Sequence, residues 1–138
     1  MGNLRRGVIK NRDFKNRVAD MSGLRFGNIT PTDIDAFLDF GDGVFVFIEG
    51  KYAGAGVQFG QGLAIQRLCD ATHCPPHRYS FLIIADHDTP PPADIDFAEM
   101  TVRTYRLNRR WVYPLAPTTV RAAVDKLLAF AKNNSKRH

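Results

Sequence analysis

The chain has 138 residues, 44% of them hydrophobic, which is enough to bury the core of one domain without disulfides. It contains no run of ~18 apolar residues and begins without the apolar segment of a secretory signal, so we expect one cytoplasmic domain over residues 1–138, with flexible tails at 1–10 and 133–138 and no membrane partner. Lysine and arginine outnumber aspartate and glutamate by 19 to 14, and the resulting pI of about 9.5 favours an anionic partner.

The first predicted elements are a helix and a β-hairpin. Two apolar residues four positions apart, among lysines and arginines, predict an amphipathic helix over residues 11–20. Residues 33–40 largely alternate apolar and acidic side chains, a period-2 pattern typical of a half-buried strand. A glycine-rich turn at 41–43 leads into the apolar run 44–48, whose β-branched and aromatic side chains indicate a central strand. The two strands are therefore expected to pair as a hairpin.

The remainder of the chain predicts a helix, three strands and a final helix. Residues 57–71 fit a helix, and the apolar run 79–85 fits a second buried strand. Two short strands are expected at 100–105 and 110–113, followed by an amphipathic helix over 118–131. This order of elements predicts an α/β fold in which a central mixed β-sheet is flanked by helices.

The turn at 41–43 sets the pairing of the two hairpin strands. A three-residue loop whose last glycine is left-handed brings the residues on either side of the loop opposite each other. That register places Asp35 opposite Glu49 and Asp33 opposite Lys51. Because side chains alternate between the two faces of a strand, Glu49 and Lys51 share one face.

The opposed carboxylates of Asp35 and Glu49 predict a metal site. Directly opposed residues have Cβ atoms only ~4.5 to 5.5 Å apart, so two carboxylates there repel each other unless a positive charge lies between them. Mg²⁺ prefers oxygen ligands and is typically held by one or two carboxylates together with substrate phosphate. The ammonium group of Lys51 is then expected beside the metal-bound water or the scissile phosphate, where it helps to deprotonate or orient the water nucleophile and stabilises the transition state.

This pattern, with an acidic strand leading through a hairpin to Glu49-Gly50-Lys51, closely resembles the PD-(D/E)XK motif of the restriction-endonuclease-like nucleases. The resemblance covers a little over half of the chain. It implies a restriction-endonuclease-like core in which Asp35, Glu49 and the backbone carbonyl of Gly50 bind Mg²⁺ or Mn²⁺ and Lys51 is the catalytic lysine. It also implies that the substrate is DNA, cleaved at its phosphodiester bonds.

Several neighbouring residues leave alternatives open. Asp33 competes with Asp35 for the metal because both face the same side of the strand; the register favours Asp35, which makes Asp33 an auxiliary acid or a partner of Lys51. Some members of the resembled superfamily place a glutamine in the helix after the Glu-x-Lys strand, which makes Gln58 and Gln61 auxiliary candidates, although the helical pattern favours a solvated helix face for both. A purely structural alternative pairs Asp33 with Lys51 and leaves the other two acids at a solvated sheet edge. The acidic segment 86–88 either approaches the metal or caps its loop.

Four arginines are interleaved with aromatic side chains in the last two predicted strands and in the turn between them. Such a mixture can contact phosphates through arginine and stack exposed bases on aromatic rings, although the aromatic residues also suit the core of a hairpin. Either way we expect the arginines to border the DNA. The four are Arg103, Arg106, Arg109 and Arg110.

A short segment with two cysteines and two histidines raises the question of zinc. Cys69, His73, Cys74 and His77 are possible ligands, but their spacing matches no familiar zinc pattern. The alternative is that Cys69 packs on the buried side of a helix while the histidines flank a proline-containing turn.

The sequence therefore predicts a Mg²⁺-dependent deoxyribonuclease that binds DNA and acts either with a protein partner or as a homodimer. One alternative is a DNA-binding protein on the same scaffold with little or no catalysis. The other is an enzyme of the same fold that acts on RNA.

Overall fold

A computed structural model describes residues 20–53 and 59–135, apart from the side chains of residues 59–61. The expected tail at 1–10 and nearly all of the expected helix at 11–20 lie outside the described residues, as does Gln58. The chain divides into two units, Met1–Pro31 and Thr32–His138. The described part of the first contains the short 3-10 helix η1 (Ser22–Leu24) and an antiparallel bridge from Phe26 to Ile29.

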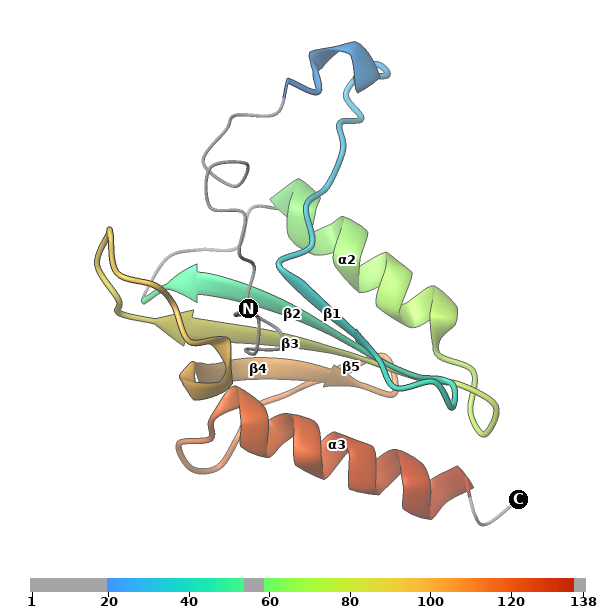
Figure 1. Cartoon of the computed structure of the whole chain (residues 1–138). Helices are drawn as coiled ribbons and strands as arrows, with labels where there is room; N and C mark the ends of the chain where they lie inside the picture. Colours follow the sequence, from blue (N-terminus) through green and yellow to red (C-terminus); the bar gives the residue numbers. More distant parts are fainter. Residues whose placement is uncertain (1–19, 54–58, 136–138) are drawn as a thin grey trace, which may run out of the picture. The chain divides into compact units, whose positions relative to one another are not determined.

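The second unit is built on a mixed five-stranded β-sheet with the strand order β1-β2-β3-β4-β5. Strands β2 and β3 are parallel, and all other neighbouring pairs are antiparallel (Figure 1). The α/β class and the mixed sheet predicted from the sequence are thus confirmed. The strands are β1 (Ala36–Asp39), β2 (Val44–Tyr52), β3 (Tyr79–His87), β4 (Thr101–Leu107) and β5 (Arg110–Val112).

Two helices cover the opposite faces of this sheet (Figure 1). Helix α2 (Phe59–Thr72) connects β2 to β3 and provides the crossover that a parallel pair requires. Helix α3 (Val120–Ser135) follows β5, and the side chain of Thr119 caps its start by accepting a hydrogen bond from the Ala122 backbone. A short 3-10 helix, η2 (Phe97–Glu99), precedes β4.

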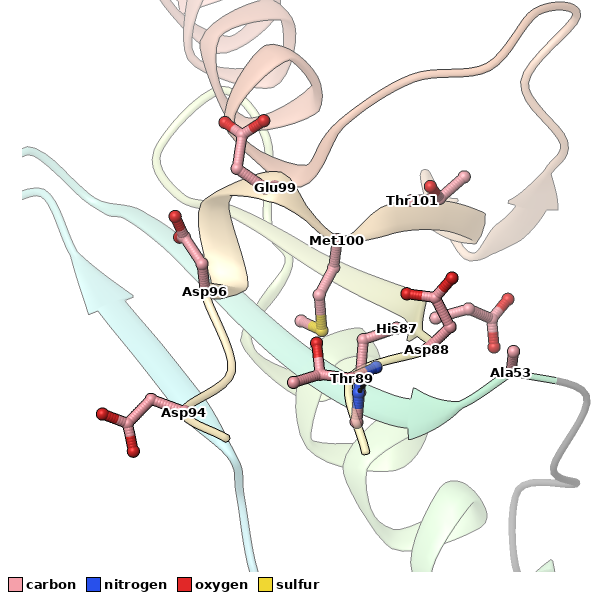
Figure 2. A pocket seen from close by; sticks show the side chains of 10 residues that line it. Ala53, His87, Asp88, Thr89, Asp94, Asp96, Glu99, Met100 and Thr101 are labelled. Carbon is pink, nitrogen blue, oxygen red and sulfur yellow. Dashed lines mark hydrogen bonds between the residues drawn. The ribbon is translucent and has the colours of Figure 1, made fainter. Parts of the chain in front are cut away.

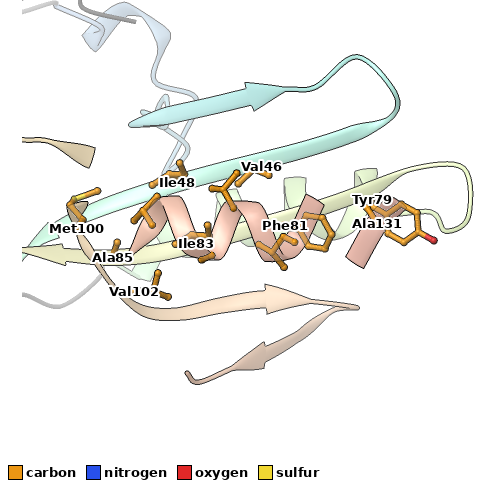
Figure 3. Close-up of a cluster of buried hydrophobic side chains, with 13 residues drawn as sticks. Val46, Ile48, Tyr79, Phe81, Ile83, Ala85, Met100, Val102 and Ala131 are labelled. Atoms are coloured by element: carbon orange, nitrogen blue, oxygen red, sulfur yellow. The ribbon is translucent and has the colours of Figure 1, made fainter. Parts of the chain in front are cut away.

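The alternation of side chains along β2 and β3 divides the core into two layers. Val46 and Phe81 face α3 together with much of that helix's apolar stripe, as Figure 3 shows for part of this cluster. Phe47 and Leu82, one position further along each strand, face α2 instead. Each such side chain is almost fully buried and contributes ~1.5 to 3 kcal/mol to folding, which explains why these two strands are apolar on both faces.

Several element boundaries differ from those expected. Strand β1 begins at Ala36 and not at residue 33, because the side chain of Asp35 accepts the Gly50 N–H that would otherwise continue the strand pairing. Helix α3 continues past the expected end at residue 131 to Ser135, and thus into the first three residues of the tail expected at 133–138. Asn134 donates a side-chain hydrogen bond to the Phe130 carbonyl and so holds this last turn. No helix in the described ranges is long and apolar enough to cross a membrane.

Candidate functional site

The hairpin register predicted from the turn is confirmed. Ala36 pairs with Ile48 in the antiparallel ladder, and one further step along the chain brings Asp35 to the position opposite Glu49. The turn needs its last glycine on two counts. Gly43 has a positive φ of 78°, and a Cβ there would lie 2.7 Å from the carbonyl oxygen of His77.

Asp35 lies just before β1 and reaches across to β2. Its Oδ2 accepts a hydrogen bond of 2.8 Å from the Gly50 backbone N–H, and the residue as a whole is exposed to solvent. The N–H and C=O groups of one residue project from the same edge of a strand. The Gly50 carbonyl therefore lies on the Asp35 side of β2. A metal ion bound by Asp35 would need it there as a third oxygen ligand.

Glu49 is the buried member of the carboxylate pair, with a relative exposure of 1%. It lies on the sheet face covered by α2, since it follows Phe47 by two residues. Its pKa is raised from an ordinary 4.5 to about 7. Burial is the largest cause, followed by a hydrogen bond with Asp35 and by repulsion from that carboxylate, whereas Lys51 acts in the opposite direction. Glu49 is thus not at a solvated edge, contrary to the purely structural alternative.

Lys51 completes the cluster from the same face of β2. Its Nζ lies 3.7 Å from Glu49 Oε2, and its side chain is 15% exposed. The structure therefore brings together the three side chains singled out from the sequence, Asp35, Glu49 and Lys51. Asp33 lies two residues before Asp35 and is exposed.

This donor set fits a divalent cation. Repulsion between the Asp35 and Glu49 carboxylates helps to raise the pKa of Glu49. A cation bound between the two carboxylates would remove this repulsion. The opposite sheet face is closed at this point, because a Cβ on Gly50 would meet Met100 Sδ at 3.1 Å. The solvent-exposed member of the carboxylate pair is Asp35.

Beyond Lys51, the ends of β2 and β3 border a cavity of about 370 Å³ whose lining includes five acidic residues (Figure 2). Asp86 pairs with Lys51 in the parallel register and binds Arg103 of β4 through two hydrogen bonds. The neighbouring His87 accepts a hydrogen bond from the Thr89 backbone, which fixes the start of the loop. The acidic segment 86–88 therefore combines an ion pair with loop capping.

The four predicted DNA-binding arginines separate into different environments. Arg106 forms two hydrogen bonds of 2.8 Å with Asp70 of α2, and Arg109 donates to backbone carbonyls of α2 and of the turn that follows it. Both are therefore committed to holding β4 and its turn against α2. Arg110 is exposed at the start of β5. Arg103 lies beside Asp86, the strand neighbour of Lys51.

The segment proposed as a zinc alternative has structural roles. His73 is buried, its Nδ1 accepts from the Ser80 backbone, and its Nε2 bonds the side chain of Asn108, so both ring nitrogens are occupied. Burial raises the pKa of the Cys69 thiol to about 12, which keeps it protonated, whereas Cys74 is exposed. Within residues 20–53 and 59–135 no group of three or more histidine, cysteine or acidic residues is arranged to hold a metal.

The two auxiliary glutamines cannot be placed in the site. Gln61 belongs to α2, but its side chain and the whole of Gln58 lie outside the described residues.

The sequence pattern did not indicate the contact between Asp86 and Arg103. Asp86 and Arg103 are 17 positions apart in the sequence and meet only because β3 and β4 pair.

No protein-family model matches this chain, and comparisons with curated proteins and with solved structures found no match either. What the site can do is therefore inferred from its own geometry and charge.

Proposed function

We propose that this protein is a metal-dependent nuclease that hydrolyses phosphodiester bonds in DNA, using Mg²⁺ or Mn²⁺ held by Asp35, Glu49 and the Gly50 carbonyl. The observation that carries the proposal is the convergence of two like-charged side chains. Asp35 and Glu49 approach closely enough to hydrogen-bond and to raise the pKa of Glu49 to about 7, with the Lys51 ammonium 3.7 Å from Glu49.

The order of elements supports a restriction-endonuclease-like core. An acidic residue leads into β1, the hairpin leads to the Glu-x-Lys end of β2, and α2 then crosses to the parallel strand β3. The resemblance seen in the sequence implies the same succession. Glu49 and Lys51 lie near the carboxyl end of β2, an interior strand of the sheet.

The roles of the residues follow from their charge and position. When bound, the metal ion lowers the pKa of a water molecule and neutralises charge on the phosphate. Asp35 and Glu49 orient that ion from two neighbouring strands. Lys51 lies where its ammonium can hydrogen-bond the attacking water or a phosphate oxygen and stabilise the negative charge that grows in the transition state. The chain's excess of basic residues favours a polyanionic substrate.

The test is conversion of supercoiled plasmid to nicked or linear DNA. We expect cleavage with Mg²⁺ or Mn²⁺ and none with EDTA. Lys51→Ala, Asp35→Asn and Glu49→Gln are each expected to lower the rate by roughly 10²- to 10³-fold or more. Lys126→Ala is the matched control, because Lys126 is an exposed lysine on α3 and its loss is expected to leave the rate unchanged.

The outcomes separate this proposal from its competitors. Equal cleavage by wild type and Lys51→Ala would reject the site. Binding of DNA without cleavage in either metal would indicate the catalytically weak scaffold instead. Parallel assays on single-stranded, duplex and RNA substrates assign the substrate class, and cleavage of RNA alone would contradict the choice of DNA.

A further inference from the structure

Strand β4 contains an irregularity at Arg103 that changes which face of the sheet this side chain occupies. Thr104 pairs with Ile84 and Val102 pairs with the next residue of β3, so Arg103 is the extra residue of a β-bulge. The packing agrees with this. Val102 and Tyr105 are three positions apart, yet both contact the core layer under α3, which strict alternation along a strand forbids.

The consequence is that Arg103 lies on the face that carries Glu49 and Lys51. Its Nε donates to Asp86 Oδ2 at 3.1 Å, and its Nη2 donates to Asp86 Oδ1. Asp86 is itself the parallel-strand neighbour of Lys51. Charged groups from β2, β3 and β4 thus run side by side across the end of the sheet, from Glu49 to Arg103.

This ion pair contributes little to holding the fold together. Arg103 and Asp86 belong to strands that already share a hydrogen-bonded ladder, whereas the Arg106 pair joins a strand to a helix. The two side chains are also 30% and 25% exposed, and ion pairs open to solvent are screened. A bulge that interrupts the ladder to place an arginine here is better explained by what the arginine binds.

The charges around the site indicate what that is. Three carboxylates, Asp35, Glu49 and Asp86, face two cations, Lys51 and Arg103, so these five groups carry a net charge of minus one when all are ionised. Four further acidic residues line the cavity at Asp86. In such acidic surroundings a phosphodiester anion needs positive partners, and a bound divalent ion, Lys51 and Arg103 supply them. The planar guanidinium of Arg103, held at one edge by Asp86, is the group whose geometry matches phosphate oxygens.

We propose that Arg103 binds a phosphate of the substrate backbone next to the scissile bond, and that Asp86 is the positioning residue that directs its guanidinium there. The proposal rests on the proposed function, because it takes nucleic acid as the substrate. Arg103 thus differs from Arg106 and Arg109, whose hydrogen bonds attach β4 and its turn to α2 and the turn after it.

The experiment compares Arg103→Ala, Arg103→Lys and Asp86→Asn with Arg121→Ala. The last is a matched control, an exposed arginine that forms a similar pair with Asp125 on α3. Binding to a fluorescein-labelled duplex is measured by anisotropy with Ca²⁺ in place of Mg²⁺, over a range of salt concentrations. The Michaelis parameters for plasmid nicking and the thermal unfolding of each variant are measured in parallel.

We expect Arg103→Ala to weaken binding and raise KM by roughly tenfold, and to reduce the slope of log K against log salt by about one. Arg103→Lys should restore the salt slope but only part of the affinity, because lysine keeps the charge without the planar fork. Asp86→Asn should raise KM while leaving the salt slope at the wild-type value. Thermal stability is expected to stay close to that of Arg121→Ala.

If wild type cleaves DNA while Arg103→Ala matches Arg121→Ala in KM and salt slope, this inference fails and the nuclease proposal stands. A loss of thermal stability in Arg103→Ala as large as that in Arg106→Ala would likewise overturn it, by making Arg103 structural. If wild type binds DNA without cleaving it, the nuclease proposal fails and the salt slope still decides the role of Arg103. Absence of both binding and cleavage overturns both proposals.

Discussion

Two clusters of charged side chains on the sheet face covered by α2 follow opposite electrostatic rules. Near the carboxyl end of β4, Arg106 pairs with Asp70 through two hydrogen bonds and lies over the ring of Trp111. At the carboxyl end of β2, two carboxylates of like sign, Asp35 and Glu49, crowd together instead. On β3, Leu82 pairs with Arg106 and Ile84 pairs with Glu49, so the two clusters are separated by two residues, about 7 Å, along that strand.

A structural charge cluster and a functional one differ in their effect on the free energy of the folded state. Opposite charges with complete hydrogen bonds lower the free energy of the folded state relative to leaving either charge alone. Two like charges raise it, and they persist where binding or catalysis requires them. The contrast predicts that removing a charge costs stability in the first cluster and activity in the second.

The largest expected effect on stability is in the paired cluster. Arg106→Ala leaves Asp70 partly buried without its guanidinium and removes the contact with Trp111. We expect the free energy of unfolding to fall by about 3 kcal/mol, measured by urea denaturation, with the cleavage rate per folded molecule unchanged. Arg110→Ala is the control, since exposed Arg110 is expected to change stability by less than about 0.5 kcal/mol. Equal effects of the two substitutions would remove the contrast.

An effect of similar size and opposite sign is expected from Glu49 and depends on pH. Because its pKa is raised from 4.5 to about 7 by burial and by Asp35, the folded state binds a proton more tightly than the unfolded state. The stability that this proton provides is fully present below about pH 4.5 and is lost as pH rises through about 7, by about 3 kcal/mol in the absence of metal.

Denaturation in EDTA between pH 4.5 and 8 measures this loss. Glu49→Gln cannot ionise, so its stability is expected to lack this decline and to exceed that of wild type at pH 8. A decline of the same size in Glu49→Gln would show that other groups cause it, and that the Asp35 and Glu49 carboxylates are not strained against each other.

The smallest expected effect is stabilisation by the metal alone. For a Kd on the order of 1 mM, 10 mM Mg²⁺ at pH 8 stabilises the fold by about 1.4 kcal/mol, which raises the Tm of a domain of this size by roughly 5 °C. Asp35→Asn and Glu49→Gln are expected to lose this shift, whereas Arg106→Ala should keep it. A shift retained in both carboxylate variants would place the metal elsewhere.

The site was predictable to the extent that it is local. The glycine turn and the period-2 pattern around it determine the register, and the register alone places Asp35 opposite Glu49 and Lys51 on the face of Glu49. The start of β1 was not predictable in the same way. It depends on a hydrogen bond that the Asp35 carboxylate accepts from the Gly50 backbone N–H in place of the strand pairing, and sequence periodicity contains no information on that choice.

The roles of the arginines show where prediction from sequence ends. In the sequence, Arg103 and Arg106 are equivalent members of one basic, aromatic segment. In the structure, Arg106 meets Asp70 across 36 residues of chain, and a bulge turns Arg103 to a face that regular alternation would deny it. Neither the Asp70 contact nor the bulge can be recognised from the residues nearby in the sequence. The sequence therefore predicts the same role for Arg103 and Arg106.

The amino-acid sequence by itself thus determined the class of fold, the hairpin and the three side chains that meet at its end, because alternation and turn geometry act between residues close along the chain. The tertiary structure decided how deeply Glu49 is buried, which acid each arginine meets, and that His73 serves the fold and not a metal. Those outcomes depend on contacts between distant segments, whose energies arise only when β3, β4 and α2 pack together.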